Sequence, residues 1–114
     1  MANLSQYTGG LLKFNKNQSI LTVQGTSTQS AAFDSNTVAI YISCRREEED
    51  AYIEIGSNPT ATISSSFYIR SYDNSNPGYG GGYVFGPIGV EAGHKVAVVG
   101  GGNNLNVHIM EMKY

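Results

Sequence analysis

The sequence predicts an all-β protein, an antiparallel β-sandwich that is jelly-roll-like or closed into a small barrel, with an extended N-terminal arm. Residues 38–44 and 51–55 alternate apolar and polar side chains with a period of two, which is typical of strands that cover a core with one face. The chain holds 14 glycines and 8 tyrosines and has little unbroken helical pattern. Short β-rich runs recur with turn residues between them, as in sandwiches and small barrels.

The chain is long enough for one domain with its own core. We divide it into an N-terminal segment, residues 1–30, and a β-sandwich, residues 31–114. Within the first segment we expect a turn at 15–19, a short strand at 20–23 and a linker at 25–30.

Two interpretations of the N-terminal segment stay open. It either supplies the first strand or two of the domain, or forms an extended arm whose apolar side chains dock on a neighbouring subunit. A helix is disfavoured by Gly9 and Gly10, each of which costs a helix about 1 kcal/mol relative to alanine. The candidate arm contacts are Leu4, Tyr7, Leu11, Leu12 and Phe14.

Residues 38–55 are the most regular part of the sequence. The charged residues 45–50 between its two strands predict a hairpin loop. Such a charge run is most often a solvated loop. The functional alternative is an electrostatic patch that fixes the register in which a partner protein binds. The predicted buried faces of the two strands are Val38, Ile40, Ile42 and Cys44, and Ala51, Ile53 and Ile55.

The second half of the chain continues the pattern of short strands, at residues 67–70, at 96–99 and from Leu105 nearly to Tyr114. In the last strand Leu105, Val107 and Ile109 alternate with Asn106, His108 and Met110. Residues 71–89 are predicted to be a long loop, with a brief strand at residues 84–85 as an option inside it. Loops of this length in a compact domain are usually functional or disordered. The aromatic side chains of this loop form the second set of candidate interface residues: Tyr72, Tyr79, Tyr83 and Phe85.

Charge and cysteine usage exclude several classes of protein. With a formal net charge of −2 and only seven Lys and Arg, the chain lacks the basic surface that nucleic-acid binding requires, so we expect no nucleic-acid partner. The single cysteine, Cys44, forbids an internal disulfide and is expected to be a core thiol. No run approaches the ~20 apolar residues that cross a membrane, and no signal-peptide pattern is seen, so we expect synthesis in a cytoplasm and no membrane partner.

A search for catalytic, cofactor and metal motifs yields no candidate. The glycines of residues 78–82 fit neither phosphate-loop pattern. Residues 73–78 resemble a calcium loop only loosely, because Pro77 occupies a ligand position. His94 and His108 stand apart from cysteines and closely spaced carboxylates, so neither is expected to hold a metal or act as a base. We therefore expect no catalytic, cofactor-binding or metal-binding residues, and no enzyme.

Four segments carry a further pattern: residues 39–44 (AIYISC), 52–61 (YIEIGSNPTA), 90–99 (VEAGHKVAVV) and 105–112 (LNVHIMEM). They resemble small virion proteins of tailed bacteriophages, of the capsid decoration (cement) type. In that group a V-x-I-S-C strand leads to I-E-I-G-S-N-P-T-A, then to a P-G-D-K-V-A-V-I-like turn and strand, and to a terminal strand ending T-E-M. The resemblance covers residues 38–112, and residues 45–50 and 71–89 depart from it.

The resemblance implies a decoration protein on the outer capsid surface of a virion, where it would bridge and stabilise subunits of the major capsid protein. It implies a homo-oligomer, with a trimer favoured, and it carries no catalytic residues. One alternative is a head–tail, fibre or tail accessory structural protein. Another is a carbohydrate-binding module that stacks sugars on the tyrosines of residues 71–89, although the chain has no tryptophan.

Overall fold

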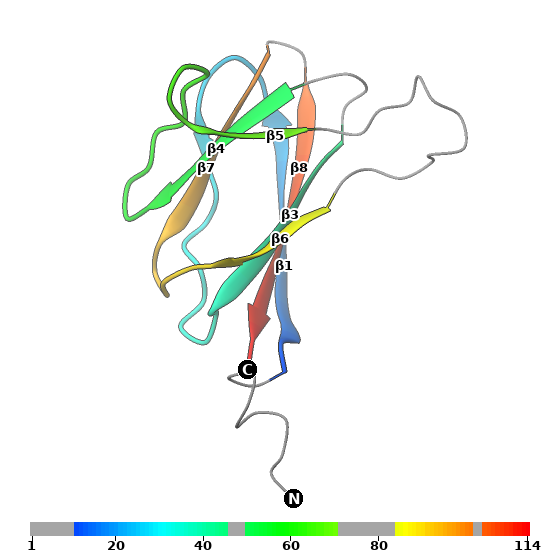
Figure 1. Cartoon of the computed structure of the whole chain (residues 1–114), viewed down its shortest axis with the longest axis vertical. Coiled ribbons are helices and arrows are strands. Elements are labelled where there is room, and N and C mark those ends of the chain that lie inside the picture. The colour runs from blue at the N-terminus through cyan, green and yellow to red at the C-terminus, as the bar shows by residue number, and fades with distance from the viewer. Residues whose placement is uncertain (1–10, 46–49, 71–83, 102–103) are drawn as a thin grey trace, which may run out of the picture.

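The computed structural model describes residues 11–45, 50–70, 84–101 and 104–114. They form two antiparallel four-stranded sheets that pack face to face in an all-β sandwich (Figure 1). The strands are β1 (Lys13–Val23), β2 (Thr28–Gln29), β3 (Ala39–Arg45), β4 (Asp50–Gly56), β5 (Phe67–Arg70), β6 (Val84–Gly89), β7 (Lys95–Gly100) and β8 (Leu105–Lys113).

The strand order is that of a jelly roll. Sheet A has the order β1-β8-β3-β6, and sheet B has the order β2-β7-β4-β5. The first strand pairs with the last, β2 with β7, β3 with β6 and β4 with β5, as if one long antiparallel ribbon had been rolled up. The pairs β3–β8 and β4–β7 then complete the two sheets. Of the two architectures that the sequence left open, the chain adopts the two-sheet jelly roll rather than a closed barrel.

The core lies between the sheets and is made mostly of β-branched side chains. On β8 buried residues alternate with more exposed ones, so one face of the strand meets sheet B and the other faces outward. The alternation predicted for residues 40–44 and 51–55 is confirmed, because their predicted inward side chains are buried or pack against the core. At the start of the first strand it does not hold, because Val38 is only half-buried and Ala39 is buried. The core residues are Ile20, Val23, Phe33, Ile40, Ile42, Cys44, Ala51, Ile53, Ile69, Val96, Val98, Leu105, Val107 and Ile109.

The predicted hairpin of residues 38–55 is wrong. β3 belongs to sheet A, where its neighbours are β8 and β6, whereas β4 belongs to sheet B. The chain between them crosses from one sheet to the other. Period-two alternation reports which face of a strand is buried, and it holds equally for two strands that face each other across a core and for two that pair edge to edge.

The turn predicted at residues 15–19 is also wrong, because β1 runs without interruption from Lys13 to Val23 beside β8. A register shift between Phe14 and Lys16 marks a bulge, where polar Asn15 hydrogen-bonds to side chains outside the strand. The linker predicted at residues 25–30 contains the short strand β2. Pairing with β8 and β7 therefore outweighs the turn and linker propensity of these polar residues.

The loop predicted at residues 71–89 extends too far, because residues 84–89 form strand β6 at the edge of sheet A. Gly86 has a φ of 137°, and a Cβ at this position would lie 2.7 Å from the carbonyl oxygen of Ile40 on β3. The glycine therefore permits a close approach between β6 and β3. The glycine-rich composition of this region led to the prediction of a loop in place of the strand.

Two connections cover parts of the sandwich. Residues 30–38 join β2 to β3 and place Phe33 in the core, with its amide donating to the carbonyl of His94 at 2.8 Å. Residues 57–66 join β4 to β5 and lay Ala61 over Ala97 and Val99 on the outer face of sheet B. β7 is consequently buried on both faces.

Candidate functional site

Exposed apolar side chains gather at the end of the molecule where β1 begins and β8 ends (Figure 1). Leu11 is 58% exposed, Phe14 61% and Tyr114 61%. Phe14 near the start of β1 lies directly opposite Met112 near the end of β8. Leu11, Phe14 and Tyr114 therefore lie at the same end of the β1–β8 pair. We call Leu11, Phe14 and Tyr114 the foot.

A second exposed apolar set lies around β5, at the far end of the sandwich from the start of β1 and the end of β8 (Figure 1). Phe67 is 71% exposed and Ile63, in the connection before it, is 66% exposed. Phe67 also borders a hollow of about 210 Å³ that is lined by Ile53, Ile55 and Ile88 together with Glu54. This hollow opens between the two edge strands β5 and β6. We call Ile63 and Phe67 the β5 corner.

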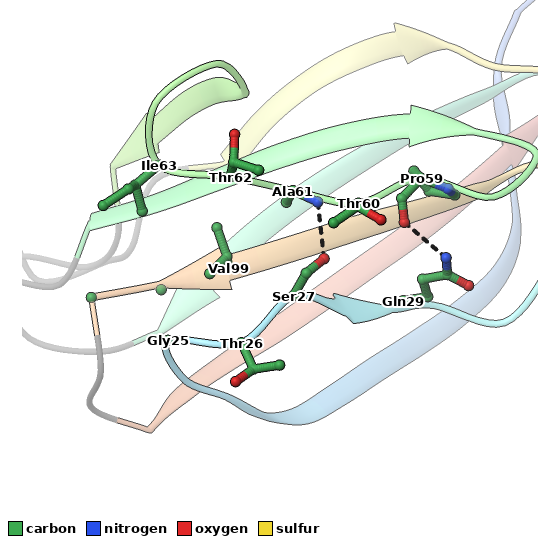
Figure 2. Close-up of a pocket in the computed structure, with 12 residues that line it drawn as sticks. Gly25, Thr26, Ser27, Gln29, Pro59, Thr60, Ala61, Thr62, Ile63 and Val99 are labelled. Carbon is green, nitrogen blue, oxygen red and sulfur yellow. Dashed lines mark hydrogen bonds between the residues drawn. The ribbon is translucent and has the colours of Figure 1, made fainter.

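A groove of about 780 Å³ lies over the end of β7 (Figure 2). One wall is the β1–β2 connection and the other is the β4–β5 connection. Hydrogen bonds fix the two walls to each other: the Ala61 amide donates to Ser27 Oγ at 2.9 Å, and Gln29 Nε2 donates to the Pro59 carbonyl at 2.8 Å (Figure 2). The lining residues are Gly25, Thr26, Ser27, Gln29, Pro59, Thr60, Ala61, Thr62, Ile63, Val99, Gly100 and Gly101.

The chemistry of this groove is limited by its lining. None of the described residues that line it has a titratable side chain or an aromatic ring. It therefore offers neither a general acid or base nor a surface for stacking a sugar ring. The hydroxyl of Ser27 is already engaged by Ala61, and the hydroxyl of Thr62 lies 2.6 Å from that of Ser65. The hydrogen bonds that close the groove serve to anchor the connection 57–66 on sheet B.

A buried carboxylate that is absent from the sequence-predicted sites lies at the end of the core. Glu111 on β8 is fully buried. Its Oε1 accepts hydrogen bonds from the Thr37 hydroxyl at 2.6 Å and from the Asp34 amide at 2.8 Å. Its Oε2 accepts a hydrogen bond from the side-chain amide of Gln18 on β1. The carboxylate thus ties the connection 30–38 to both β8 and β1.

The network continues toward the surface through Asn15 and Asp34. Asn15 Nδ2 donates to Thr37 Oγ1 at 3.0 Å and to Asp34 Oδ2 at 3.2 Å. The hydrogen bond from Asn15 holds the pKa of the Asp34 carboxyl below its usual value. Every donor in this set bonds within the protein, which describes a structural clasp rather than a site awaiting a ligand. The sequence does contain a signal for this buried carboxylate. Glu111 continues the inward series of Leu105, Val107 and Ile109 on the last strand, where an apolar residue is expected.

The sequence-predicted interface residues are only partly placed. Leu4, Tyr7, Tyr72, Tyr79 and Tyr83 lie outside the described residues. Leu11 and Phe14 are exposed in the foot, and Leu12 beside them is half-buried. Phe85 lies on β6 opposite Ile42 and packs against the core, so its side chain is part of the sandwich rather than of a contact loop.

The cysteine and the histidines have ordinary surroundings. Cys44 is fully buried, and burial raises the pKa of its thiol to about 12, which describes an inert core residue. His94 Nε2 lies 3.2 Å from a carboxylate oxygen of Glu91 in the turn before β7. His108 is half-buried on the outer face of β8. No group of three potential metal ligands occurs among the residues that the structure describes.

Comparison of the chain with protein-family profiles, with curated proteins and with solved structures finds no match. The described part of the chain contains no helix that could span a membrane. Function has to be argued from the fold and from the surfaces described above.

Proposed function

We propose that this chain is a structural virion protein of a tailed bacteriophage, a capsid decoration (cement) protein that bridges and stabilises subunits of the major capsid protein. It acts on the outer capsid surface as a homo-oligomer, with a trimer as the favoured state. The likeness to virion proteins over residues 38–112 supports the phage assignment, and the jelly roll is an architecture that viral capsid domains often use. Because one fold serves many functions, the surfaces have to carry the argument.

The observation that carries the proposal is the presence of two separate exposed apolar sets on one rigid body. The foot lies at the end of the sandwich where β1 begins and β8 ends, and the β5 corner lies at the other end (Figure 1). A continuous core between the two sheets holds them at a fixed separation. A body with this arrangement can contact two neighbours at once, and such contact is what a bridging protein requires.

The size of each contact suits a repeated, individually weak interaction. Fully burying a large apolar side chain is worth about 1.5–3 kcal/mol. Each of the three foot residues is already partly buried and has 58–61% of its surface exposed, so burying the exposed part of all three supplies roughly 3–5 kcal/mol before association costs. The candidate arm, with Leu4 and Tyr7, precedes the foot and adds apolar contact on the same neighbour. Repetition of such contacts over a whole shell gives a large total stabilisation by multivalency.

Cosedimentation with shells of the major capsid protein from the same genome tests the proposal. We expect the wild-type protein to pellet with assembled shells, and expect Phe14→Lys and Phe67→Lys each to lower the bound amount, because each places an ammonium group in an apolar contact. Thr60→Lys, an exposed residue of the groove wall, is the matched control and should still bind. Wild-type protein that stays in the supernatant while shells form would contradict the proposal.

The two alternative functions have their own outcomes. Recovery of the protein in tail or fibre fractions, and not with shells, would favour a tail accessory protein. A carbohydrate-binding module would bind glycans on an array through the tyrosines of residues 71–89. The groove gives that alternative no support, because it lacks aromatic rings and charged or amide side chains other than Gln29.

A further inference from the structure

Three of the four lysines of the chain lie on one face of the β1–β8 pair. Lys13 of β1 lies directly opposite Lys113 of β8. Lys16 lies opposite Glu111, which is two residues before Lys113 on β8 and therefore on the same face. Lys13 and Lys16 are exposed, and Lys113 is half-buried. We call Lys13, Lys16 and Lys113 the lysine cluster.

A bulge in β1 brings two of these lysines to the same face. Lys13 and Lys16 are three positions apart, so their side chains would point to opposite faces of a regular strand. The register shift between Phe14 and Lys16 inserts Asn15 as an extra residue and returns Lys16 to the face of Lys13. The local backbone is therefore arranged in a way that gathers positive charge.

The pair Lys13–Lys113 works against the stability of the free protein. Like charges that lie directly opposite each other on neighbouring strands are destabilising. Within the described part of the chain, neither lysine has an ion pair or a side-chain hydrogen bond. Both ammonium groups are therefore left to bind a partner from outside the chain.

The two carboxylates nearest the lysine cluster are engaged elsewhere. Glu111 is fully buried, and both of its oxygens accept hydrogen bonds within the clasp. The charge of Lys16 acts on Asp34, but a carboxylate oxygen of Asp34 already accepts a hydrogen bond from Asn15 at 3.2 Å. The cluster thus keeps a net positive charge.

Protection of a sheet edge does not explain the cluster. Lysines on edge strands keep sheets from pairing edge to edge, and this role would suit Lys13 and Lys16, because β1 is an edge of sheet A. Lys113 lies on β8, which has β1 on one side and β3 on the other. A lysine on an interior strand, placed opposite another lysine, requires a different role.

We propose that the lysine cluster binds carboxylates of an acidic surface on the capsid subunit that the foot contacts. This inference rests on the proposed function for the identity of the partner, and it deepens that function by naming the chemistry of the partner surface. The cluster adjoins the foot, because Lys13 lies between Leu11 and Phe14 in the chain and Lys113 precedes Tyr114.

Charge and apolar surface together identify the class of partner. The chain carries a net charge of −2, so the cluster is a local reversal of sign. Lysine binds carboxylates and phosphates through charge-assisted hydrogen bonds. Three lysines neutralise few phosphates, and the foot beside them needs apolar side chains on the partner, which a phosphate backbone does not offer. An acidic protein surface satisfies both requirements.

Binding of the full chain to assembled shells at two salt concentrations tests the inference. In the double variant Lys13→Gln with Lys113→Gln, we expect the affinity for shells to fall about tenfold at about 0.1 M salt. Between about 0.1 M and 1 M salt the wild type should lose affinity and the double variant should lose less, since the screening length falls from about 10 Å to about 3 Å. Lys95→Gln, a half-buried lysine of β7 outside the cluster, is the matched control and should bind as the wild type does.

Thermal unfolding of the free variants separates lost binding from lost folding. The double variant should unfold at the same temperature as the wild type or above it, because the substitutions remove a like-charge pair. Equal affinity of the wild type and this folded double variant for shells at low salt would overturn the inference and leave the proposed function standing.

An NMR titration of the free chain with hexaglutamate gives a readout that does not need shells. We expect amide shifts confined to residues 13–16 and 111–114, and we expect them to vanish in the double variant. No shifts there, or shifts produced by a DNA hexanucleotide and not by hexaglutamate, would overturn the inference. If the wild type does not bind shells, the proposed function fails, and the titration alone decides whether the lysine cluster recognises carboxylates.

Discussion

Replacement of Glu111 by glutamine should destabilise the protein more than any other charge-neutralising change of a described carboxylate. The carboxylate accepts hydrogen bonds from Thr37 and Asp34 at one oxygen and from Gln18 at the other. An amide has a single oxygen, so the NH₂ group of the new glutamine in Glu111→Gln takes the place of one accepting oxygen. This NH₂ group then faces another donor, and one hydrogen bond is lost. Gln18 cannot turn its own amide to compensate, because its Oε1 accepts from the Ala31 amide at 3.1 Å.

The magnitude follows from the groups left without partners. A hydrogen bond to a charged group contributes about 1.5–3 kcal/mol, and an orphaned buried donor costs about 1–3 kcal/mol. Glu111→Gln loses one such bond, so we expect about 2 kcal/mol. Glu111→Ala orphans the donors of Thr37, Asp34 and Gln18 and also leaves a cavity, so we expect about 4 kcal/mol.

Urea denaturation followed by far-UV circular dichroism measures both changes in the free energy of unfolding. Tyrosine fluorescence is the second probe, because the chain has no tryptophan. Glu54→Gln is the control, since Glu54 is exposed and accepts a hydrogen bond from Ser66 at 2.8 Å; it should change stability by less than about 0.5 kcal/mol. A Glu111→Gln protein as stable as Glu54→Gln would refute the clasp.

Three further predictions concern the thiol, the acid range and a glycine. Burial raises the folded-state pKa of the Cys44 thiol to about 12 from 9.0. The stability contributed by the neutral thiol is therefore complete below pH 9 and fades as pH rises toward 12. At pH 10.5 the free energy of unfolding of the wild type, measured by urea denaturation, should have fallen by about 2 kcal/mol more than that of Cys44→Ala. The pKa of Asp34 is lowered from 3.8, chiefly by the hydrogen bond from Asn15. The stability that the ionised carboxylate contributes is therefore present above pH 4 and is lost as the pH falls below 4. Between pH 6 and pH 3 the urea midpoint of Asp34→Asn should drop less than that of the wild type. Gly86→Ala places a Cβ 2.7 Å from the Ile40 carbonyl at a φ of 137° and should cost about 1–3 kcal/mol, whereas Gly89→Ala, with open space around its Cβ, should cost less in the same measurement.

The fold class was readable from the sequence because it depends on local patterns. Alternation identified the inward faces of β3, β4 and β8, and these faces form the core. The pairing of strands was not readable, because alternation is the same for neighbours in one sheet and for strands that face each other across the core. The error over residues 38–55 came from assuming the shortest connection, whereas the chain there crosses between sheets.

The candidate contact surfaces and the buried carboxylate were less predictable because they depend on tertiary structure. The foot includes Leu11 and Phe14, which were singled out as apolar residues in a polar segment. Glu111 looked like one more polar residue near the end of the chain, and only the connection 30–38, folded over the core, explains why a carboxylate is buried there.

The disruption temperature of assembled shells, measured with and without bound protein, tests the bridging claim most directly. The account predicts that wild-type protein raises this temperature. It also predicts that Phe67→Lys, loaded to the same occupancy through the foot, raises it little, because only one of its two contacts remains. Equal stabilisation by wild type and Phe67→Lys at equal occupancy, or no stabilisation by the wild type, would contradict the claim that the foot and the β5 corner bridge two capsid subunits.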